Sequence, residues 1–158
     1  MAQQLWFLRH GEAEPHGAAP DDDRALTERG EGQSESAGRA LAALGVTFQF
    51  AFTSPKVRSA QTARLACRHL GIEASTHEPL REGFDREEAI ALLRAAGDDQ
   101  RILLVGHEPD FSQTVHDLTG ARIDLKKGGI AAVRLEGGGG ELIVLLRPSE
   151  LDRLAAAP

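Results

Sequence analysis

Short apolar runs along the chain alternate with longer segments in which apolar residues recur every three or four positions. Four runs predict strands, at residues 5–8, 48–53, 72–77 and 102–105. Four periodic segments predict helices, at residues 28–44, 55–70, 86–96 and 109–118. The fourth run, Ile-Leu-Leu-Val at residues 102–105, is typical of a strand that is buried on both faces. This alternation favours an α/β fold with a mostly parallel sheet.

Residues with strong positional preferences mark the predicted helix ends. Thr27 and Asp85 are expected N-caps, because their side-chain oxygens can accept from free amides of the first turn. Ser54 followed by Pro55 predicts a further helix start, with Ser as the cap and Pro at the first helical position. The polar segment Glu14–Asp23 is expected to be an exposed loop.

The last part of the chain departs from the alternation. Residues 130–135 and 141–146 are joined across four glycines and predict a hairpin. The segment after Pro148 is expected to form a short peripheral helix or to fray. We find no internal repeat and no linker, so the pattern predicts one domain over residues 1–158. Its expected architecture is a three-layer α/β/α sandwich with a mostly parallel sheet and a C-terminal hairpin strand.

Composition and charge narrow the class of protein. Hydrophobic residues make up 41% of the 158 residues, which excludes a wholly disordered chain. The formal net charge of −6 disfavours a nucleic-acid partner that is bound through bulk electrostatics. No apolar run approaches the ~20 residues of a membrane span, so no membrane partner is expected. The single Cys excludes an intrachain disulfide and favours a reducing, cytoplasmic location.

Charged and imidazole side chains lie at or shortly after the C-terminal ends of the predicted strands. They are Arg9 and His10, Arg58, Glu82, and His107. Because the carboxyl ends of parallel strands meet at one edge of a sheet, these side chains are expected to converge. Each arginine can make paired, charge-assisted bonds to phosphate oxygens. Gly11, directly after His10, is expected to let the backbone approach the ligand closely.

Each of these residues also has an ordinary structural explanation when it is taken alone. Glu82 lies in a charged stretch that is typical of a solvated loop, and His107 could be a hydrogen-bonded structural histidine. A catalytic zinc site is disfavoured, because Phe111 stands where the second histidine of a zinc-protease helix would be. The glycines at 137–140 lie between two strands, so they predict a turn and not a phosphate-binding loop.

Four segments, in this order and spacing, resemble the motifs of the histidine phosphatase superfamily, whose fold is phosphoglycerate mutase-like. They are Arg9–Ala13, Leu26–Gly30, Ser54–Ala63 and Val105–Pro109. The match extends from about Gln4 to Arg147. The small size and the segment Lys127–Val133 are similar to the compact SixA branch, which contains bacterial phosphohistidine phosphatases.

The resemblance implies a role for each candidate residue. His10 corresponds to the nucleophile, and Arg9, Arg58 and His107 to the groups that bind the phosphoryl oxygens. Glu82 fits the pattern of the carboxylate that donates a proton to the leaving group. The implied reaction passes through a covalent phosphohistidine and needs no metal ion and no cofactor.

The chain has little room for the insertions that cap the site in related mutases and sugar bisphosphatases. An open site favours a phosphorylated protein as the substrate, for example a histidine-phosphotransfer domain. Two alternatives stay open. One is a phosphatase of a small phosphomonoester, with residues 14–23 as a lid. The other is a phosphate-binding module without turnover.

Overall fold

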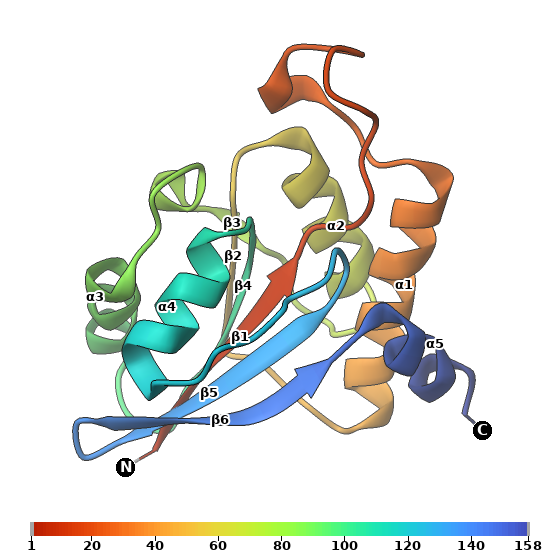
Figure 1. Cartoon of the computed structure of the whole chain (residues 1–158). Coiled ribbons are helices and arrows are strands. Elements are labelled where there is room, and N and C mark those ends of the chain that lie inside the picture. Colours follow the sequence, from red (N-terminus) through yellow and green to blue (C-terminus); the bar gives the residue numbers. More distant parts are fainter. Residues whose placement is uncertain (1, 158) are drawn as a thin grey trace.

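The computed structural model describes residues 2–157, and its centre is one six-stranded sheet (Figure 1). In the order β3-β2-β4-β1-β5-β6, the strands are Ser75–Thr76, Phe50–Thr53, Arg101–Gly106, Gln3–Arg9, Ile130–Glu136 and Gly139–Leu146. The first four run parallel to one another. β5 pairs antiparallel with β1, and β6 pairs antiparallel with β5. The predicted mostly parallel sheet with a C-terminal hairpin is therefore confirmed.

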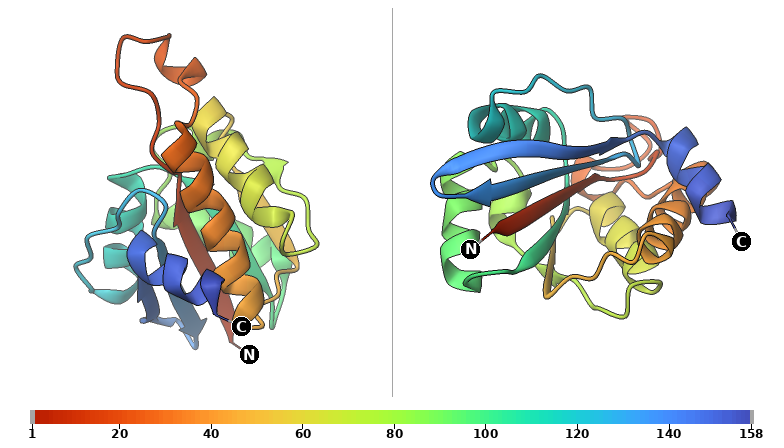
Figure 2. Two further views of the ribbon diagram at one scale, coloured as in Figure 1. Left: turned by 90° about the vertical axis from the view of Figure 1, so that its right-hand side faces the viewer. Right: turned by 90° about the horizontal axis from the view of Figure 1, so that it is seen from below.

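Helices cover both faces of this sheet, which completes the predicted three-layer sandwich (Figure 2). The helices on one face are α1 (Glu28–Ala43), α2 (Val57–Cys67) and α5 (Pro148–Ala156). Those on the other face are α3 (Arg86–Ala96) and α4 (Asp110–Thr119). Alternate residues of β1 point to the two layers, with Trp6 and Leu8 on one side and Leu5 and Phe7 on the other. Burial on both faces explains why this strand is a continuous apolar run.

Two of the predicted helix caps are confirmed and one is wrong. The Thr27 hydroxyl accepts a hydrogen bond from the Gly30 amide at 3.1 Å, and the Asp85 carboxylate accepts from the Glu88 amide at 3.0 Å. Ser54 does not cap α2, which begins at Val57. Its hydroxyl instead lies against the His107 ring and accepts from the Lys56 amide, so the chain turns once more before the helix begins.

The weakest predicted strand is shorter than expected. Only Ser75 and Thr76 of residues 72–77 form β3, which pairs with the last two residues of β2. Both residues are exposed at the edge of the sheet, where few apolar contacts favour a longer strand. The C-terminal segment forms the helix α5, which packs on α1 and buries Leu151 fully.

The loop between β1 and α1 projects beyond the carboxyl end of β1 (Figure 1). A bridge between Ala13 and Leu26 closes it, and it contains a 3-10 turn, η1 (Asp21–Asp23). A second 3-10 turn, η2 (Glu78–Leu80), precedes Glu82. Over the described residues, no helix is both long enough and apolar enough to cross a membrane.

Candidate active site

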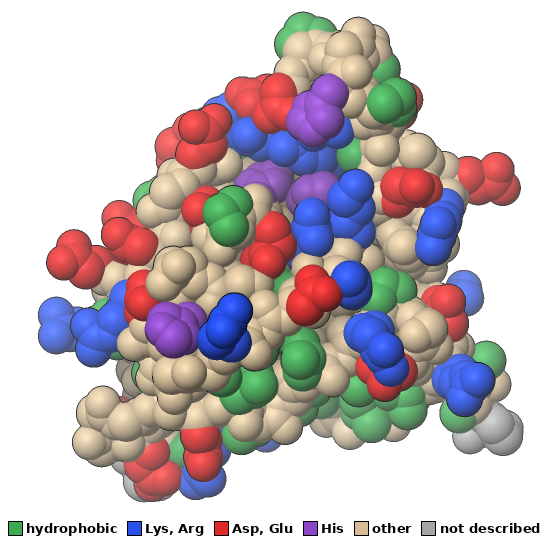
Figure 3. Space-filling view, in the orientation of Figure 1, with side chains coloured by type: hydrophobic (Ala, Val, Ile, Leu, Met, Phe, Trp, Pro, Cys, Tyr) green, Lys and Arg blue, Asp and Glu red, His purple; other side chains and the backbone are tan. Residues whose placement is uncertain are grey.

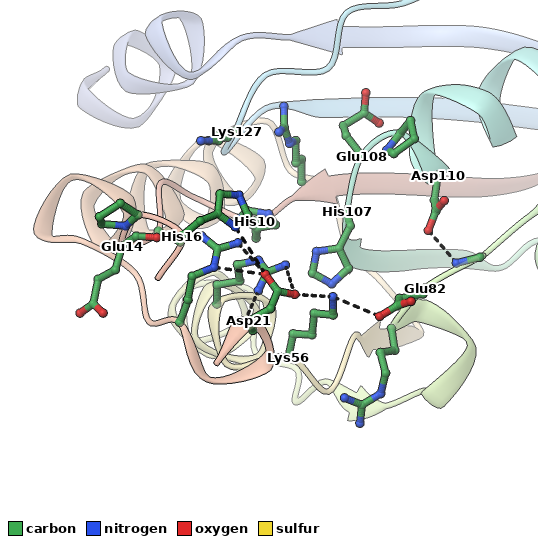
Figure 4. A pocket seen from close by; sticks show the side chains of 18 residues that line it. His10, Glu14, His16, Asp21, Lys56, Glu82, His107, Glu108, Asp110 and Lys127 are labelled. Carbon is green, nitrogen blue, oxygen red and sulfur yellow. Dashed lines mark hydrogen bonds and ion pairs between the residues drawn. The ribbon is translucent and has the colours of Figure 1, made fainter. Parts of the chain in front are cut away.

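The carboxyl ends of β1, β2 and β4 open into a cavity of about 480 Å³, and all five candidate residues line it (Figure 4). We call Arg9, His10, Arg58 and His107 the floor of this cavity. The floor residues His10, Arg58 and His107 are only 5–7% exposed. We call the two segments 14–23 and 81–83 its rim, where Asp21 and Glu82 lie. Residues that are far apart in the chain thus share one concave site.

The two imidazoles meet because β1 and β4 are adjacent parallel strands. Arg9 pairs in register with Gly106, so His10 and His107 each follow directly after a paired position. The His10 amide donates to the Gly106 carbonyl at 3.0 Å, which extends the ladder by one bond. The two ring centroids lie 5.2 Å apart.

The tautomer of His10 follows from its hydrogen bond. Its Nδ1 lies 2.7 Å from the carbonyl oxygen of Gly11, which can only accept, so Nδ1 carries the proton. The lone pair is then on Nε2. Burial lowers the pKa of His10 to about 3, and the charges of Arg58, Arg9 and Lys127 act in the same direction. At neutral pH this ring is therefore uncharged and nucleophilic.

His107 is held by hydroxyl groups. Its Nε2 lies 2.7 Å from Ser54 Oγ and 3.4 Å from Ser59 Oγ. Burial lowers the pKa of His107 to about 3, and the nearby charges of Arg58 and Lys56 lower it as well. Its Nδ1 is buried and has no hydrogen-bond partner within residues 2–157. A neutral ring with one unsatisfied nitrogen is a polar group that a ligand can still engage.

The two floor guanidinium groups are only partly satisfied. Arg9 Nη1 donates to the Leu125 carbonyl at 2.9 Å, and Arg58 Nη1 donates to the Asp21 carbonyl at 2.8 Å. The Nε atoms of both arginines are buried, and neither has an acceptor in the described part of the chain. Burial lowers the pKa of each guanidinium, although arginine stays charged at any ordinary pH. Buried donors without acceptors suit an oxyanion ligand.

Lys56 is a floor-side cation that the sequence analysis did not select. Its side chain is 8% exposed, and its Nζ lies 2.8 Å from Asp21 Oδ2, 3.8 Å from Asp22 Oδ1 and 3.6 Å from Glu82 Oε1. Lys56 directly follows the predicted helix start at Ser54 and Pro55. A lysine at such a position is usually a surface residue, so it is not among the candidate residues of the sequence analysis. The signal that was available is its place three residues after the end of β2.

Asp21 places a carboxylate among the cations of the site (Figure 4). It bonds Lys56, accepts from Arg24 Nη2 at 3.0 Å, and lies 3.4 Å from Arg58 Nη2. The hydrogen bond from Lys56, followed by that from Arg24, holds the pKa of Asp21 well below its usual range. A resident anion in this position indicates that the cluster attracts negative charge.

Glu82 lines the cavity but does not lie on its floor. Its side chain is 76% exposed, and its ion pair with Lys56 is its link to the rest of the site.

Gly11 packs closely against the backbone of α1. A Cβ at this position would lie 2.5 Å from the carbonyl oxygen of Gly30 in α1, so the small residue is needed for backbone packing. The expectation that Gly11 lets the backbone approach a ligand stays a prediction. Across the described residues, no group of three or more His, Cys, Asp or Glu side chains is placed to hold a metal ion.

Known proteins share this sequence pattern and this architecture. The family model for the Histidine phosphatase superfamily (branch 1) matches residues 5–88. An uncharacterized protein of Picosynechococcus sp. is 34% identical over 139 residues, which cover 83% of this chain and 84% of that protein. The serine/threonine-protein phosphatase Pgam5 of Drosophila melanogaster is 30% identical over 126 residues, which are 78% of this chain and 38% of Pgam5.

The fold has a solved counterpart of nearly the same extent. The structure of the protein histidine phosphatase SixA complexed with tungstate superimposes with a TM-score of 0.84 and 26% identity, and covers 94% of this chain and 99% of SixA. The motifs, the sheet topology and the family match agree with one another. The chain belongs to the histidine phosphatase superfamily, has the compact fold of its SixA-type members, and is a phosphatase.

Proposed function

We propose that residues 1–158 form one histidine phosphatase domain that hydrolyses phosphohistidine on a protein, with His10 as the nucleophile. The observation that carries this proposal is the neutral His10 ring, whose Nδ1 is bonded to the Gly11 carbonyl and whose Nε2 is free. The likeness to SixA, which is described as a protein histidine phosphatase, supports this substrate class.

In the first proposed step, the lone pair of His10 Nε2 attacks the phosphorus in line with the leaving group. The new N–P bond forms as the bond to the leaving group breaks. A phosphohistidine leaving group departs as neutral imidazole with the proton that its other ring nitrogen already carries, whereas an alkoxide would take its proton from Glu82. The donors of Arg9, Arg58 and His107 bind the three equatorial oxygens and stabilise the charge that spreads over them. All three side chains line the cavity.

In the second step, water attacks the phosphorus of the phosphohistidine. The N–P bond breaks, its electron pair returns to His10 Nε2, and the water supplies the fourth oxygen and one proton of the released phosphate. The second proton of the water passes to solvent, or replaces the proton that Glu82 gave up where the leaving group was an alkoxide. The ring is again neutral, with its proton on Nδ1, so the site is ready for another turnover. The summed reaction consumes one water per phosphoryl group and changes no oxidation state.

The exposure of Glu82 supports phosphohistidine over an alkyl phosphate as the substrate. An alkoxide leaves only when it is protonated in the transition state, an effect worth ~10²–10⁴ in rate. An imidazole has a pKa near ~6.5 and leaves readily once protonated, so it needs no strongly positioned acid. The rim carboxylate is well placed to assist, but the proposed substrate depends on it less.

The test compares kcat/KM on a phosphohistidine peptide with kcat/KM on a panel of small phosphate esters, and traps the intermediate with a radiolabelled phosphoryl group. We expect the peptide to be preferred, and we expect acid-labile, base-stable label on the wild type but none on His10→Ala. Preference for an ester would overturn the substrate assignment. A chain that takes up no label and hydrolyses none of these compounds would instead be a phosphate-binding module.

A further inference from the structure

A second cavity, of about 460 Å³, adjoins the catalytic one, and both Arg9 and Lys127 line the two. It lies between the first half of α1, the turn at 126–129 and the start of α5. Four exposed cations line it, and we call them the basic groove: Arg29, Lys126, Lys127 and Arg147. Figure 3 shows Lys and Arg side chains gathered beside the His side chains on this face.

The basic groove carries positive charge that its surroundings do not neutralise. The single carboxylate in its lining, Glu12, accepts a hydrogen bond from the Thr27 hydroxyl at 2.8 Å. Arg29 and Lys127 form no ion pair with any described residue. Lys126 and Arg147 pair with Asp124 and Glu150, but these pairs are more than 40% exposed and therefore weak. A chain of net charge −6 thus concentrates cations on one side of its active site.

The turn that carries the two lysines is fixed to the catalytic strand. The Gly128 amide lies 3.0 Å from the carbonyl oxygens of both Arg9 and His10, and the Arg9 amide donates to the Gly129 carbonyl at 3.1 Å. Gly128 has φ +76°, a left-handed conformation that favours glycine. The Lys-Lys-Gly-Gly sequence therefore holds two ammonium groups beside the backbone of the proposed nucleophile.

The catalytic cavity and the basic groove differ in how their charges are balanced. In the cavity, the cations face Asp21, Asp22 and Glu82. In the groove, Arg29 and Lys127 have no carboxylate partner among the described residues, and the partners of Lys126 and Arg147 are exposed. This arrangement suits the edge of a macromolecular contact, where opposite charges speed association and select partners, more than it suits an enclosed small-molecule site.

We propose that the basic groove docks an acidic surface of the phosphorylated protein, next to its phosphohistidine. This inference rests on the proposed function. It adds one property of the substrate, namely that the protein surface around the phosphohistidine is acidic. Carboxylates on that surface would contact Arg29 and Lys126 while the phosphoryl group reaches the floor of the cavity past Arg9 and Lys127. The local attraction would offset the repulsion between the acidic partner and this acidic chain.

The test uses two phosphohistidine peptides of equal length, one flanked by Asp and Glu and the other by Ser and Gly, with free phosphohistidine as the small substrate. The variant is Arg29→Glu/Lys126→Glu, because neither residue lines the catalytic cavity. The control is Arg94→Glu/Arg122→Glu, which makes the same change of net charge at exposed positions outside both cavities.

For the wild type at low ionic strength, we expect kcat/KM to favour the acidic peptide by about tenfold, and we expect high salt to reduce that preference. The groove variant should lose the preference and keep its activity on free phosphohistidine, whereas the control variant should keep both. A preference that is absent in the wild type, or unchanged in the groove variant, overturns the docking proposal while the phosphohistidine activity stands.

Two other outcomes are informative. If the wild type hydrolyses none of the phosphohistidine substrates but does hydrolyse p-nitrophenyl phosphate, the proposed function fails, and the docking proposal fails with it. If the groove variant selectively loses activity on fructose 1,6-bisphosphate and leaves the peptide preference unchanged, the groove binds a second phosphate of a small substrate. That result would also overturn the docking proposal.

Discussion

The floor of the proposed catalytic cavity is built from strand ends and the first turn of α2, whereas its rim is exposed and built from loops. His10 and His107 are each 7% exposed and follow adjacent strands in a fixed register. On the rim, the Asp21 side chain is 46% exposed and that of Glu82 is 76% exposed. A buried residue on a rigid strand end keeps its geometry for any substrate. Exposed loop residues are therefore the ones that can distinguish one substrate from another.

The sharpest test of the floor is His10→Ala. Since this change removes the proposed nucleophile, we expect turnover to fall by roughly 10⁴-fold or more on every substrate. The control is His116→Ala in α4, an exposed histidine that does not line the cavity, and we expect it to stay within about twofold of the wild type. Substantial residual turnover in His10→Ala would mean that another group attacks the phosphorus.

Arg58→Ala tests the floor without touching the nucleophile. Losing one preorganised donor to the transition-state oxygens should lower kcat by ~10²–10³ on peptides and on esters alike. Arg64→Ala, on an exposed position of the same helix and outside the cavity, is the matched control. A loss confined to one substrate class would place Arg58 functionally on the rim.

Glu82→Gln tests the rim as the source of substrate discrimination. We expect phosphate-ester hydrolysis to fall by about 10²-fold because an alkoxide needs the proton, and phosphohistidine hydrolysis to change by less than about threefold. Glu78→Gln, an exposed carboxylate of the neighbouring turn, serves as the control. Equal losses on both substrates would count against a proton-donor role.

Asp21→Asn asks whether the resident carboxylate competes with the ligand. Removing its charge from beside Lys56 and Arg58 should tighten the binding of tungstate or inorganic phosphate by several-fold, measured by titration calorimetry. Asp23→Asn, in the same turn, keeps the cluster intact and should leave the affinity unchanged. Weaker oxyanion binding in Asp21→Asn would show that this carboxylate organises the cations instead of competing for them.

The smallest effect concerns stability at mildly acidic pH. The pKa of His10 and that of His107 are lowered to about 3 in the folded chain, against about 6.5 when unfolded. Between these values the unfolded chain binds more protons, so the free energy of unfolding falls as the pH falls below about 6.5. The pKa values of the Asp21 and Glu35 carboxylates are also lowered in the folded chain, but they change the free energy of unfolding only below about pH 5.

Thermal unfolding at about pH 7 and at about pH 5 therefore tests the contribution of these two histidines. We expect a lower Tm at the acidic pH, and a smaller decrease for His10→Gln. His116→Gln, an exposed histidine far from the cavity, should behave like the wild type. If His10→Gln leaves the pH dependence unchanged, the folded chain does not disfavour the charged form of His10.

The sequence predicts the floor better than the rim for a physical reason. Apolar runs and helix periodicity locate the ends of β1, β2 and β4, and parallel strands bring those ends to one edge. Asp21 could not be found in this way, because its position depends on how a loop folds over the cavity. Lys56 had an available signal, its place three residues after the end of β2. Glu82 lines the cavity as a strand-end residue should, while its catalytic role stays a prediction.

The secondary-structure predictions failed at Ser54 and at β3, where contacts with residues distant in the chain determine the local structure. The local sequence predicts Ser54 as a helix cap. Its hydroxyl instead contacts the ring of His107, which follows a strand about fifty residues further along the chain. β3 is short because its partner β2 offers it only Phe52 and Thr53. Neither neighbour is visible in the local pattern of residues.

The close backbone contact between Gly11 and Gly30 holds the loop after β1 against the start of α1. A Cβ at Gly30 would lie 2.0 Å from the Glu12 carbonyl oxygen, and one at Gly11 would meet Gly30 equally badly. A single added methyl group at either place would push the loop after β1 away from α1 and shift the His10 ring relative to the His107 ring. During divergence the two positions are therefore constrained together, and a chain that lost either glycine would lose alignment of its reactive groups while retaining every one of them.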